Sequence, residues 1–323
     1  MKSGGVLNIL TYHAVTPGAP PLDDWCFLPA RSFAAQMAFL HRFGFDVVPL
    51  AEGVEALQAG RLKRRSVAIT FDDGYRNNLT TALPILEKYG YPATVFVVSG
   101  FTGSDKTLWP NRVVAALEAT AKPAIELEGQ HFPLGSRDEK VRASRDLQRL
   151  IKVAFAADPN AGAAAVERAC GTAVDPGFGP DHDFAMMDTA MMRETAARGL
   201  IEFGAHTVTH PILSKLSDAD LDAEITGSVA SVAEAAGRPC RTFAYPNGSY
   251  DDFDDRAVTL LRASGVSASV TTFQDRARPD DDPFYLPRWD IGSDITLARF
   301  GATVSGVYPF RLSRAEKPRL PAY

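Results

Sequence analysis

The sequence has 323 residues, 46% hydrophobic and 23% charged, an ordinary globular composition with ample material for a large core. Its formal net charge of −5 excludes the strongly basic character typical of nucleic-acid-binding proteins. The three cysteines are far apart and form no disulfide framework. No apolar window reaches the length of a membrane span, and the N-terminal one is too short for a signal peptide. We therefore expect a cytoplasmic protein without an integral membrane segment.

Strand and helix patterns alternate through the first 100 residues. Short apolar runs bounded by turn residues are typical of buried parallel strands, and the amphipathic stretches between them are typical of helices. The predicted strands are residues 6–10, 46–50, 66–71 and 92–98, and the predicted helices are 31–44, 51–60 and 80–90.

The pattern changes between residues 101 and 195. Residues 124–135 alternate around Glu128 and Gly129 as a β-hairpin does. The segments around this hairpin have helical periodicity, at residues 113–120, 140–157 and 158–170. Because they carry their own apolar positions, we interpret residues 101–195 as an inserted, mainly helical lobe near the barrel mouth.

The alternation resumes after the lobe. Strands are predicted at 200–206, 241–246 and 266–273, and helices at 217–237 and 251–265. This number of β and α units predicts an α/β fold whose parallel sheet is closed or partly closed into a barrel. Residues 1–100 and 196–305 would form the barrel, and 306–323 a C-terminal tail.

Polar side chains follow several of these strands. In parallel α/β folds the chemistry gathers where strands end, so these residues are expected at one barrel mouth. They are His13; Asp72 and Asp73; His206 and His210; Tyr245, Pro246 and Asn247; and Arg288, Trp289 and Asp290.

The two histidines His206 and His210 suggest a metal site. A spacing of four on a helical turn places both imidazoles on one face, and a carboxylate from a neighbouring strand completes a His₂Asp set with open positions for water. Zinc suits this set best, although cobalt, nickel, manganese or iron also suit it. The alternative is two surface histidines at the start of a helix.

The adjacent carboxylates of Asp72 and Asp73 have two interpretations. Asp-Asp-Gly is ordinary turn chemistry. Near a divalent ion, however, one carboxylate can bind the metal while the other takes a proton from an activated water. The second interpretation explains why the carboxylate is doubled.

These motifs resemble the NodB-type polysaccharide deacetylases of carbohydrate esterase family four. The resemblance rests on "TFDDG" (70–74) and "HTVTH" (206–210) and covers residues 6–100 and 196–300, without the lobe. It implies a distorted (β/α) barrel that removes N-acyl groups from sugars with one divalent metal ion. In this family's pattern Asp72 is the general base, and Asp73, His206 and His210 are the metal ligands.

The resemblance also assigns roles to later residues. In "FAYPNG" (243–248), Pro246 and Gly248 match a family motif whose backbone helps hold the oxyanion, while Asn247 replaces the usual tyrosine. Arg288 resembles the arginine that orients the base. Trp289 is a candidate wall of the acyl pocket.

The sequence departs from the family at the catalytic acid. The usual C-terminal Leu-x-His is absent, since no histidine follows His210. "LTYHAV" (10–15) is similar to a variant in which a Tyr-His strand end supplies the acid, so we hypothesise that His13 protonates the leaving amine. The alternative is a hydrogen-bonded core histidine. Trp109, in the lobe, is a further candidate to close over the substrate.

We therefore expect a metal-dependent hydrolase that removes an acetyl or formyl group from an amino sugar. The expected substrate is an intracellular nucleotide- or lipid-linked precursor of a surface glycan. One alternative is an amidase acting on a non-sugar amide or a cyclic imide, because the lobe leaves the substrate open. Another is a non-catalytic carbohydrate-binding barrel, although such a protein would tend to lose the base or a ligand.

Overall fold

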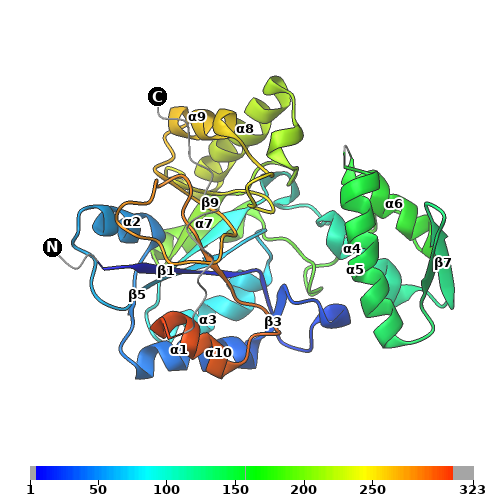
Figure 1. The fold of residues 1–323 in the computed structure, drawn as a ribbon, viewed down its shortest axis with the longest axis horizontal. Coiled ribbons are helices and arrows are strands. Elements are labelled where there is room, and N and C mark those ends of the chain that lie inside the picture. The colour runs from blue at the N-terminus through cyan, green and yellow to red at the C-terminus, as the bar shows by residue number, and fades with distance from the viewer. Residues whose placement is uncertain (1–4, 157, 308–323) are drawn as a thin grey trace.

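A computed structural model describes residues 5–156 and 158–307. Its main element is a curled parallel sheet in the order β11-β10-β9-β6-β5-β1-β12, with β4 beside β5 (Figure 1). The strands are β1 (Leu7–Tyr12), β4 (Asp46–Val47), β5 (Ser66–Phe71), β6 (Ala93–Val97), β9 (Ile201–Ala205), β10 (Thr242–Ala244), β11 (Ala268–Val270) and β12 (Trp289–Asp290). The predicted distorted barrel is confirmed.

The central strands are continuous apolar runs because both of their faces are covered. Every residue of β1, β5 and β6 is buried. An irregular segment ending in β12 spans the gap between strands β11 and β1 of the curled sheet. It bridges β11 where Leu286 pairs with Val270, and it pairs with β1 where Trp289 lies beside Leu10.

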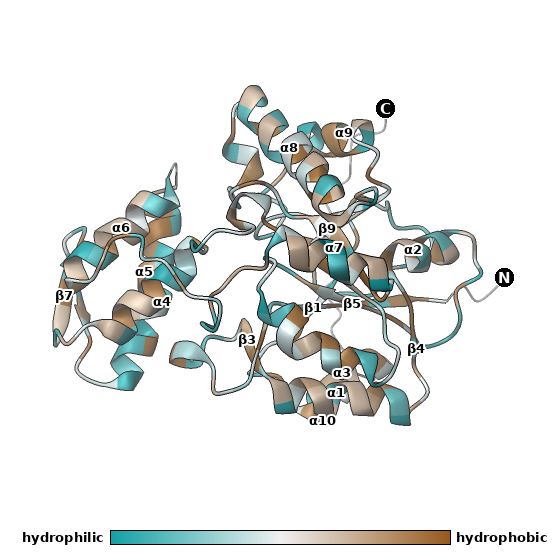
Figure 2. Ribbon diagram, turned by 180° about the vertical axis from the view of Figure 1, so that it is seen from behind, coloured by the Kyte–Doolittle hydropathy of each residue, from teal (hydrophilic) through white to brown (hydrophobic). Residues whose placement is uncertain are grey.

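Amphipathic helices cover the outside of the sheet (Figure 2). They are α1 (Ala30–Arg42), α2 (Leu50–Gln58), α3 (Leu83–Glu87), α7 (Thr189–Arg198), α8 (Asp218–Ala236), α9 (Asp255–Ala263) and α10 (Leu297–Ser305). The stretch predicted as one helix over 80–90 begins instead with a π-helical turn, Asn78–Ala82, before α3. A short pair, β2 (Ala14–Thr16) and β3 (Phe27–Pro29), lies beyond β1.

A separate lobe stands beside the barrel (Figure 1). It consists of α4 (Trp109–Ala119), the hairpin β7 (Ala124–Leu127) and β8 (Gln130–Pro133), α5 (Arg137–Ala154) and α6 (Pro159–Cys170). Its apolar core continues onto Phe27 of β3 and onto Tyr75. The lobe also contains a buried ion pair, in which Arg112 Nη2 lies 2.6 Å from Glu167 Oε2. The last lobe helix ends at Cys170, and the predicted boundary at residue 195 falls within α7, which packs on the barrel.

No helix among the described residues combines the length and hydrophobicity that crossing a bilayer requires. Most of the predicted tail, residues 308–323, lies outside the described residues.

Candidate active site

The loop after β9 brings His206 and His210 together, but the predicted helical turn is wrong. Thr207 and His210 have φ angles of 66° and 64°, in the left-handed region that no α-helix contains. The Thr207 hydroxyl accepts a hydrogen bond from the His210 backbone N–H at 2.9 Å. The loop closes tightly enough to place the two imidazole centroids 4.9 Å apart.

Glu224 of α8 holds this loop from outside. Its Oε2 accepts hydrogen bonds from the backbone N–H groups of Val208 (2.7 Å) and Thr209 (2.9 Å), and its Oε1 accepts one from the Thr209 hydroxyl (2.6 Å). The sequence analysis missed Glu224, because its only signal is one more glutamate in an acidic amphipathic helix.

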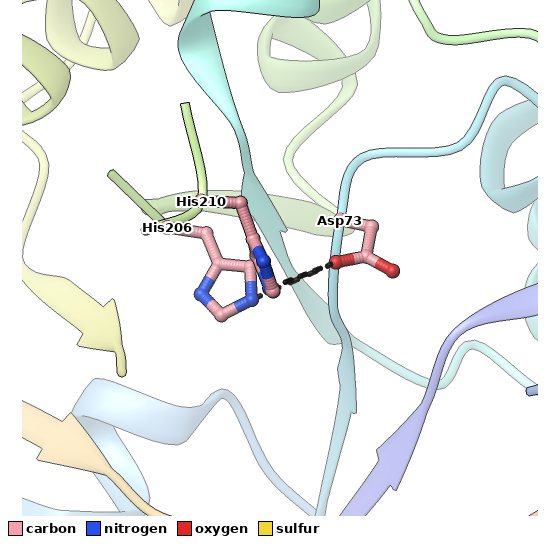
Figure 3. A group of neighbouring side chains, drawn as sticks. All are labelled: Asp73, His206 and His210. Carbon is pink, nitrogen blue, oxygen red and sulfur yellow. Dashed lines mark ion pairs between the residues drawn. The ribbon is translucent and has the colours of Figure 1, made fainter. Parts of the chain in front are cut away.

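Asp73 faces both histidines (Figure 3). Its Oδ1 lies 3.6 Å from His206 Nε2 and 3.8 Å from His210 Nε2, and the potential ligand atoms of all three residues lie within 4.8 Å of one another. Two ligand atoms of a tetrahedral zinc site lie about 3.3 Å apart. His206 Nδ1 donates to the Ala244 carbonyl at 2.7 Å, which leaves the Nε2 lone pair directed toward Asp73.

The charges in this cluster also fit a divalent cation. Burial, together with the neighbouring charge of Asp72, raises the pKa of Asp73 to about 8. Burial lowers the pKa of His206 and of His210, so both imidazoles are neutral near pH 7. A buried carboxyl facing two neutral imidazoles is a donor set that a divalent cation would complete and keep ionised.

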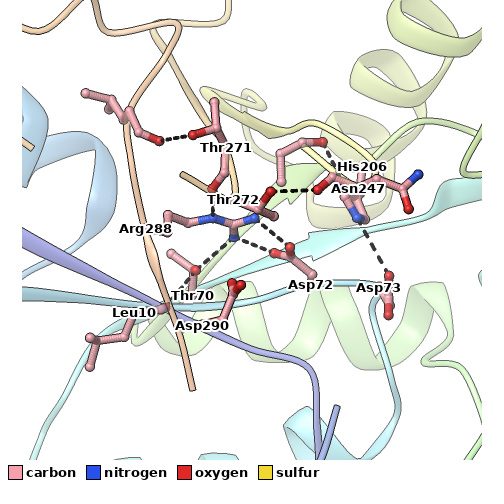
Figure 4. Close-up of polar contacts among 12 residues, drawn as sticks. Leu10, Thr70, Asp72, Asp73, His206, Asn247, Thr271, Thr272, Arg288 and Asp290 are labelled. Carbon is pink, nitrogen blue, oxygen red and sulfur yellow. Dashed lines mark hydrogen bonds and ion pairs between the residues drawn. The ribbon is translucent and has the colours of Figure 1, made fainter. Parts of the chain in front are cut away.

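Asp72 has a different environment from its neighbour (Figure 4). Its Oδ1 and Oδ2 each accept a 2.7 Å hydrogen bond from Arg288, through Nη1 and Nη2. Arg288 is fully buried and is itself held by the Thr271 carbonyl and the Thr70 hydroxyl. Burial raises the pKa of Asp72, but Arg288 outweighs burial and sets it at about 2. Asp72 is therefore an ionised, rigidly held carboxylate.

His13 follows β1 and lines the same cavity as both aspartates. Its carbonyl accepts a 2.6 Å hydrogen bond from Asn78, and its ring lies edge-on to Trp25 at 5.3 Å between centroids. Burial lowers the pKa of His13 to about 4, although the charge of Asp72 opposes this shift. The imidazole is therefore neutral near pH 7.

The site opens into a cavity of about 600 Å³, within the usual range of small-molecule sites. Its lining includes His13, Asp72, Asp73, His206, His210, Tyr245, Asn247 and Asp290.

Several predicted contact residues lie elsewhere. Trp289 lines a neighbouring cavity of about 310 Å³, and Trp109 lines one of about 290 Å³ beside His210. Neither they nor Pro246 are among the residues that line the central cavity. Tyr245 borders this cavity but is 1% exposed, and its hydroxyl donates to the Phe284 carbonyl, so it mainly supports the wall.

A hydrogen-bond network joins the lobe to the Asp73 turn. The side-chain amide of Asn111 in α4 donates to the Tyr75 hydroxyl at 2.9 Å and to the Thr107 hydroxyl at 2.8 Å. Tyr75 also hydrogen-bonds Asp73 and lowers its pKa. Sequence reasoning missed Tyr75 and Asn111, because the contact depends on how the lobe docks.

Asp290 gives a pH-dependent prediction. Burial raises its pKa from an ordinary 3.8 to about 6, although Arg288 opposes the shift. The folded state therefore binds this proton more tightly, and the resulting stabilisation is present below about pH 4 and lost as the pH rises through 6. The Asp290→Asn variant is expected to gain up to about 3 kcal/mol in unfolding free energy over wild type above pH 7, and nothing at pH 4.

Urea unfolding of both proteins at pH 4, 6 and 7.5 measures this difference. The exposed Asp181→Asn variant, whose charge does not act on Asp290, is the matched control and should track wild type. A constant difference across this pH range would contradict the prediction.

A curled parallel barrel with a buried Asp-His-His cluster beside an Asp-Arg pair places the chain in a known class of protein. The sequence profile described as polysaccharide deacetylase matches residues 59–146 and 154–268, more than half of the chain. The chain therefore belongs to the polysaccharide deacetylase family, as the sequence motifs indicated.

Two curated relatives align over part of their length. The protein YxkH of Bacillus subtilis (strain 168) is 35% identical over 98 residues, which are 30% of this chain and 33% of that protein. The poly-β-1,6-N-acetyl-D-glucosamine N-deacetylase of Staphylococcus epidermidis is 31% identical over 107 residues, 29% of this chain and 37% of that protein. The alignments thus span about a third of each relative.

Solved structures of low sequence identity share the fold. The Streptococcus pyogenes deacetylase PplD, in complex with acetate, matches 94% of this chain and 99% of its own with a TM-score of 0.63 at 19% identity. IcaB from Ammonifex degensii matches 93% of this chain and 97% of its own with a TM-score of 0.59 at 21% identity. The match over most of the chain includes the lobe region as well as the barrel.

Proposed function

We propose that this protein is a metal-dependent hydrolase that removes an N-acyl group from an amino sugar. One observation carries the proposal: Asp73 faces two neutral histidines while the adjacent Asp72 is held, ionised, by Arg288. The family membership of the chain supports the same reaction class.

In this proposal each residue has one task. Asp73, His206 and His210 hold the ion, and zinc is the ion that suits them best. The ion supplies Lewis acidity, which lowers the pKa of water toward about 7 and polarises a carbonyl. Asp72 accepts the proton of the attacking water. The low pKa of Asp72 makes it a weak base. It can still accept the proton of the attacking water, because the ion would already have made that water more acidic.

His13 is the proposed donor to the leaving amine, which leaves poorly unless protonated. It is neutral in the resting protein, so it takes up a proton from solvent as negative charge develops at the acyl oxygen, and passes this proton to the amine nitrogen as the C–N bond breaks. The oxyanion role of the backbone at 246–248 stays a prediction.

Acetyl is the proposed acyl group, because a relative acts on poly-β-1,6-N-acetyl-D-glucosamine by name. A formyl group would use the same residues. That the substrate is a nucleotide- or lipid-linked precursor of a surface glycan, handled in the cytoplasm, also stays a prediction. The cavity of about 600 Å³ suits a single sugar with part of its linkage.

The test combines metal content with release of acyl groups. Purified wild type is expected to hold about one divalent ion per chain and to release acetate or formate from N-acylated hexosamines, whereas Asp73→Ala and His206→Ala hold none and release nothing. An enzyme that binds metal but hydrolyses only simple amides or cyclic imides would be an amidase. Protein that binds no zinc or cobalt when either is added would overturn the metal-dependent mechanism.

A further inference from the structure

We propose that helix α5 of the lobe selects substrates in which the N-acyl sugar carries an anionic group, a phosphate or a carboxylate, through Arg145 and Lys152. This inference rests on the proposed function and adds the chemical class of the substrate.

Helix α5 forms one wall of the active-site cavity. Val141, Ser144, Arg145, Gln148 and Lys152 line the same cavity as Asp72, Asp73 and both histidines. Their spacing places them on one face of the helix, beside the buried positions that anchor α5 in the lobe core. Arg145 and Lys152 are seven residues apart, two turns or about 10 Å along this face. A ligand that extends from the metal site along this cavity therefore reaches two cations on α5.

Neither cation is neutralised by the lobe. Arg145 has no ion-pair partner among the described residues, and it acts on Asp24 only from a distance. Lys152 donates to the Asn247 amide oxygen at 3.0 Å, which is an uncharged partner. Lys152 and His210 line the same cavity.

The acidic residues of the cavity rim are already engaged. Asp23 accepts a hydrogen bond from Arg137 at 3.2 Å, Asp24 accepts one from the backbone of its own turn, and Asp252 accepts the backbone N–H of Ser249 at 2.8 Å. Deeper in the site, Arg288 neutralises Asp72. Asp290, which also lines the cavity, accepts the Gln274 amide at 2.7 Å. The carboxylates held by neutral donors keep their negative charge, so an anionic ligand is expected against the α5 wall and away from them.

Phosphate and carboxylate oxygens are the groups that arginine and lysine bind best, through charge-assisted hydrogen bonds. A neutral sugar would offer both cations only hydroxyl oxygens, which form weaker hydrogen bonds than an ionised group does. An anion joined to the N-acyl sugar would bridge from the metal site to the α5 wall, and so position the acyl group.

Four proteins and three substrates test the proposal. The proteins are wild type, Arg145→Gln, Lys152→Gln and the control Arg142→Gln/Arg149→Gln, which removes charge from other exposed positions of the same helix. The substrates are a UDP-linked N-acetylhexosamine, an N-acetylhexosamine–uronic acid disaccharide and a neutral β-1,6-linked N-acetylglucosamine disaccharide. The first two distinguish a phosphate from a carboxylate.

We expect Arg145→Gln and Lys152→Gln each to raise the KM of at least one anionic substrate about tenfold, which corresponds to the loss of roughly one charge-assisted hydrogen bond. The KM of the neutral disaccharide should stay within about twofold, and the control should match wild type throughout. Equal losses on charged and neutral substrates, or a neutral substrate preferred by wild type, would overturn the proposal.

Binding measured by calorimetry separates this proposal from the proposed function. If wild type releases neither acetate from these three compounds nor formate from their N-formyl analogues, the proposed function fails. The affinity of the two anionic compounds still tests the role of α5. Weaker binding to Arg145→Gln or Lys152→Gln than to wild type supports this role, and unchanged binding overturns it.

Discussion

Replacing Asp72 with asparagine is expected to lower kcat/KM by roughly 10²- to 10⁴-fold while the protein keeps its metal ion. Asparagine preserves the shape of the side chain but cannot accept a proton. Asp73, His206 and His210 are unchanged in this variant, so the three-residue donor set stays intact. Activity and metal content, measured on the same preparation, check both halves of the prediction.

Asp73→Asn is the matched control, because it makes the same chemical change one residue away. It should lose the ion and the activity together, whereas Asp72→Asn loses only the activity. Loss of metal in both variants would make Asp72 a ligand and contradict the division of roles. Full activity in Asp72→Asn would remove it as the base.

Much of this site could be predicted because its chemistry lies at strand ends. The run Ser66–Phe71 is β5 as expected, and it delivers Asp72 and Asp73 to the barrel mouth. The pairing of Arg288 with Asp72 was expected from the family resemblance, and the structure contains this contact. A continuous apolar run bounded by turn residues indicates such a strand locally, and a period of 3.6 residues indicates a helix.

The parts that the sequence did not reveal depend on long-range packing. The loop from His206 to His210 was expected to be helical, because a spacing of four fits a helical turn. The carboxylate of Glu224, which is 16 residues after Val208, binds the backbone N–H groups of Val208 and Thr209 and holds the loop in its non-helical conformation. Trp109 and Trp289 were placed near the substrate by residue type, yet each lines a neighbouring cavity. The position of each of these side chains depends on how its helix or strand packs against the rest of the protein, and a local sequence pattern does not predict that packing.

The second large effect concerns Arg288. Replacing it with methionine is expected to lower the unfolding free energy by about 3–5 kcal/mol, because Asp72 would remain as an uncompensated buried charge. Arg288 is fully buried and Asp72 is 3% exposed, so water cannot replace the lost partner. The pKa of Asp72 should rise, since Arg288 is what opposes the effect of burial. The residual activity of the variant should then fall at acidic pH, because Asp72 becomes protonated there, whereas wild type should not show this loss.

The double variant Asp72→Asn/Arg288→Met tests whether this loss comes from the unpaired charge. Because it leaves no charge behind, it should recover a large part of the stability lost in Arg288→Met, which urea unfolding of both single variants and the double variant would measure as a coupling energy. Lys63→Met, which breaks the exposed pair with Asp46, should cost under about 1 kcal/mol. A double variant no more stable than Arg288→Met would mean that Arg288 acts through its packing and its bonds to Thr70 and Thr271, and not through Asp72.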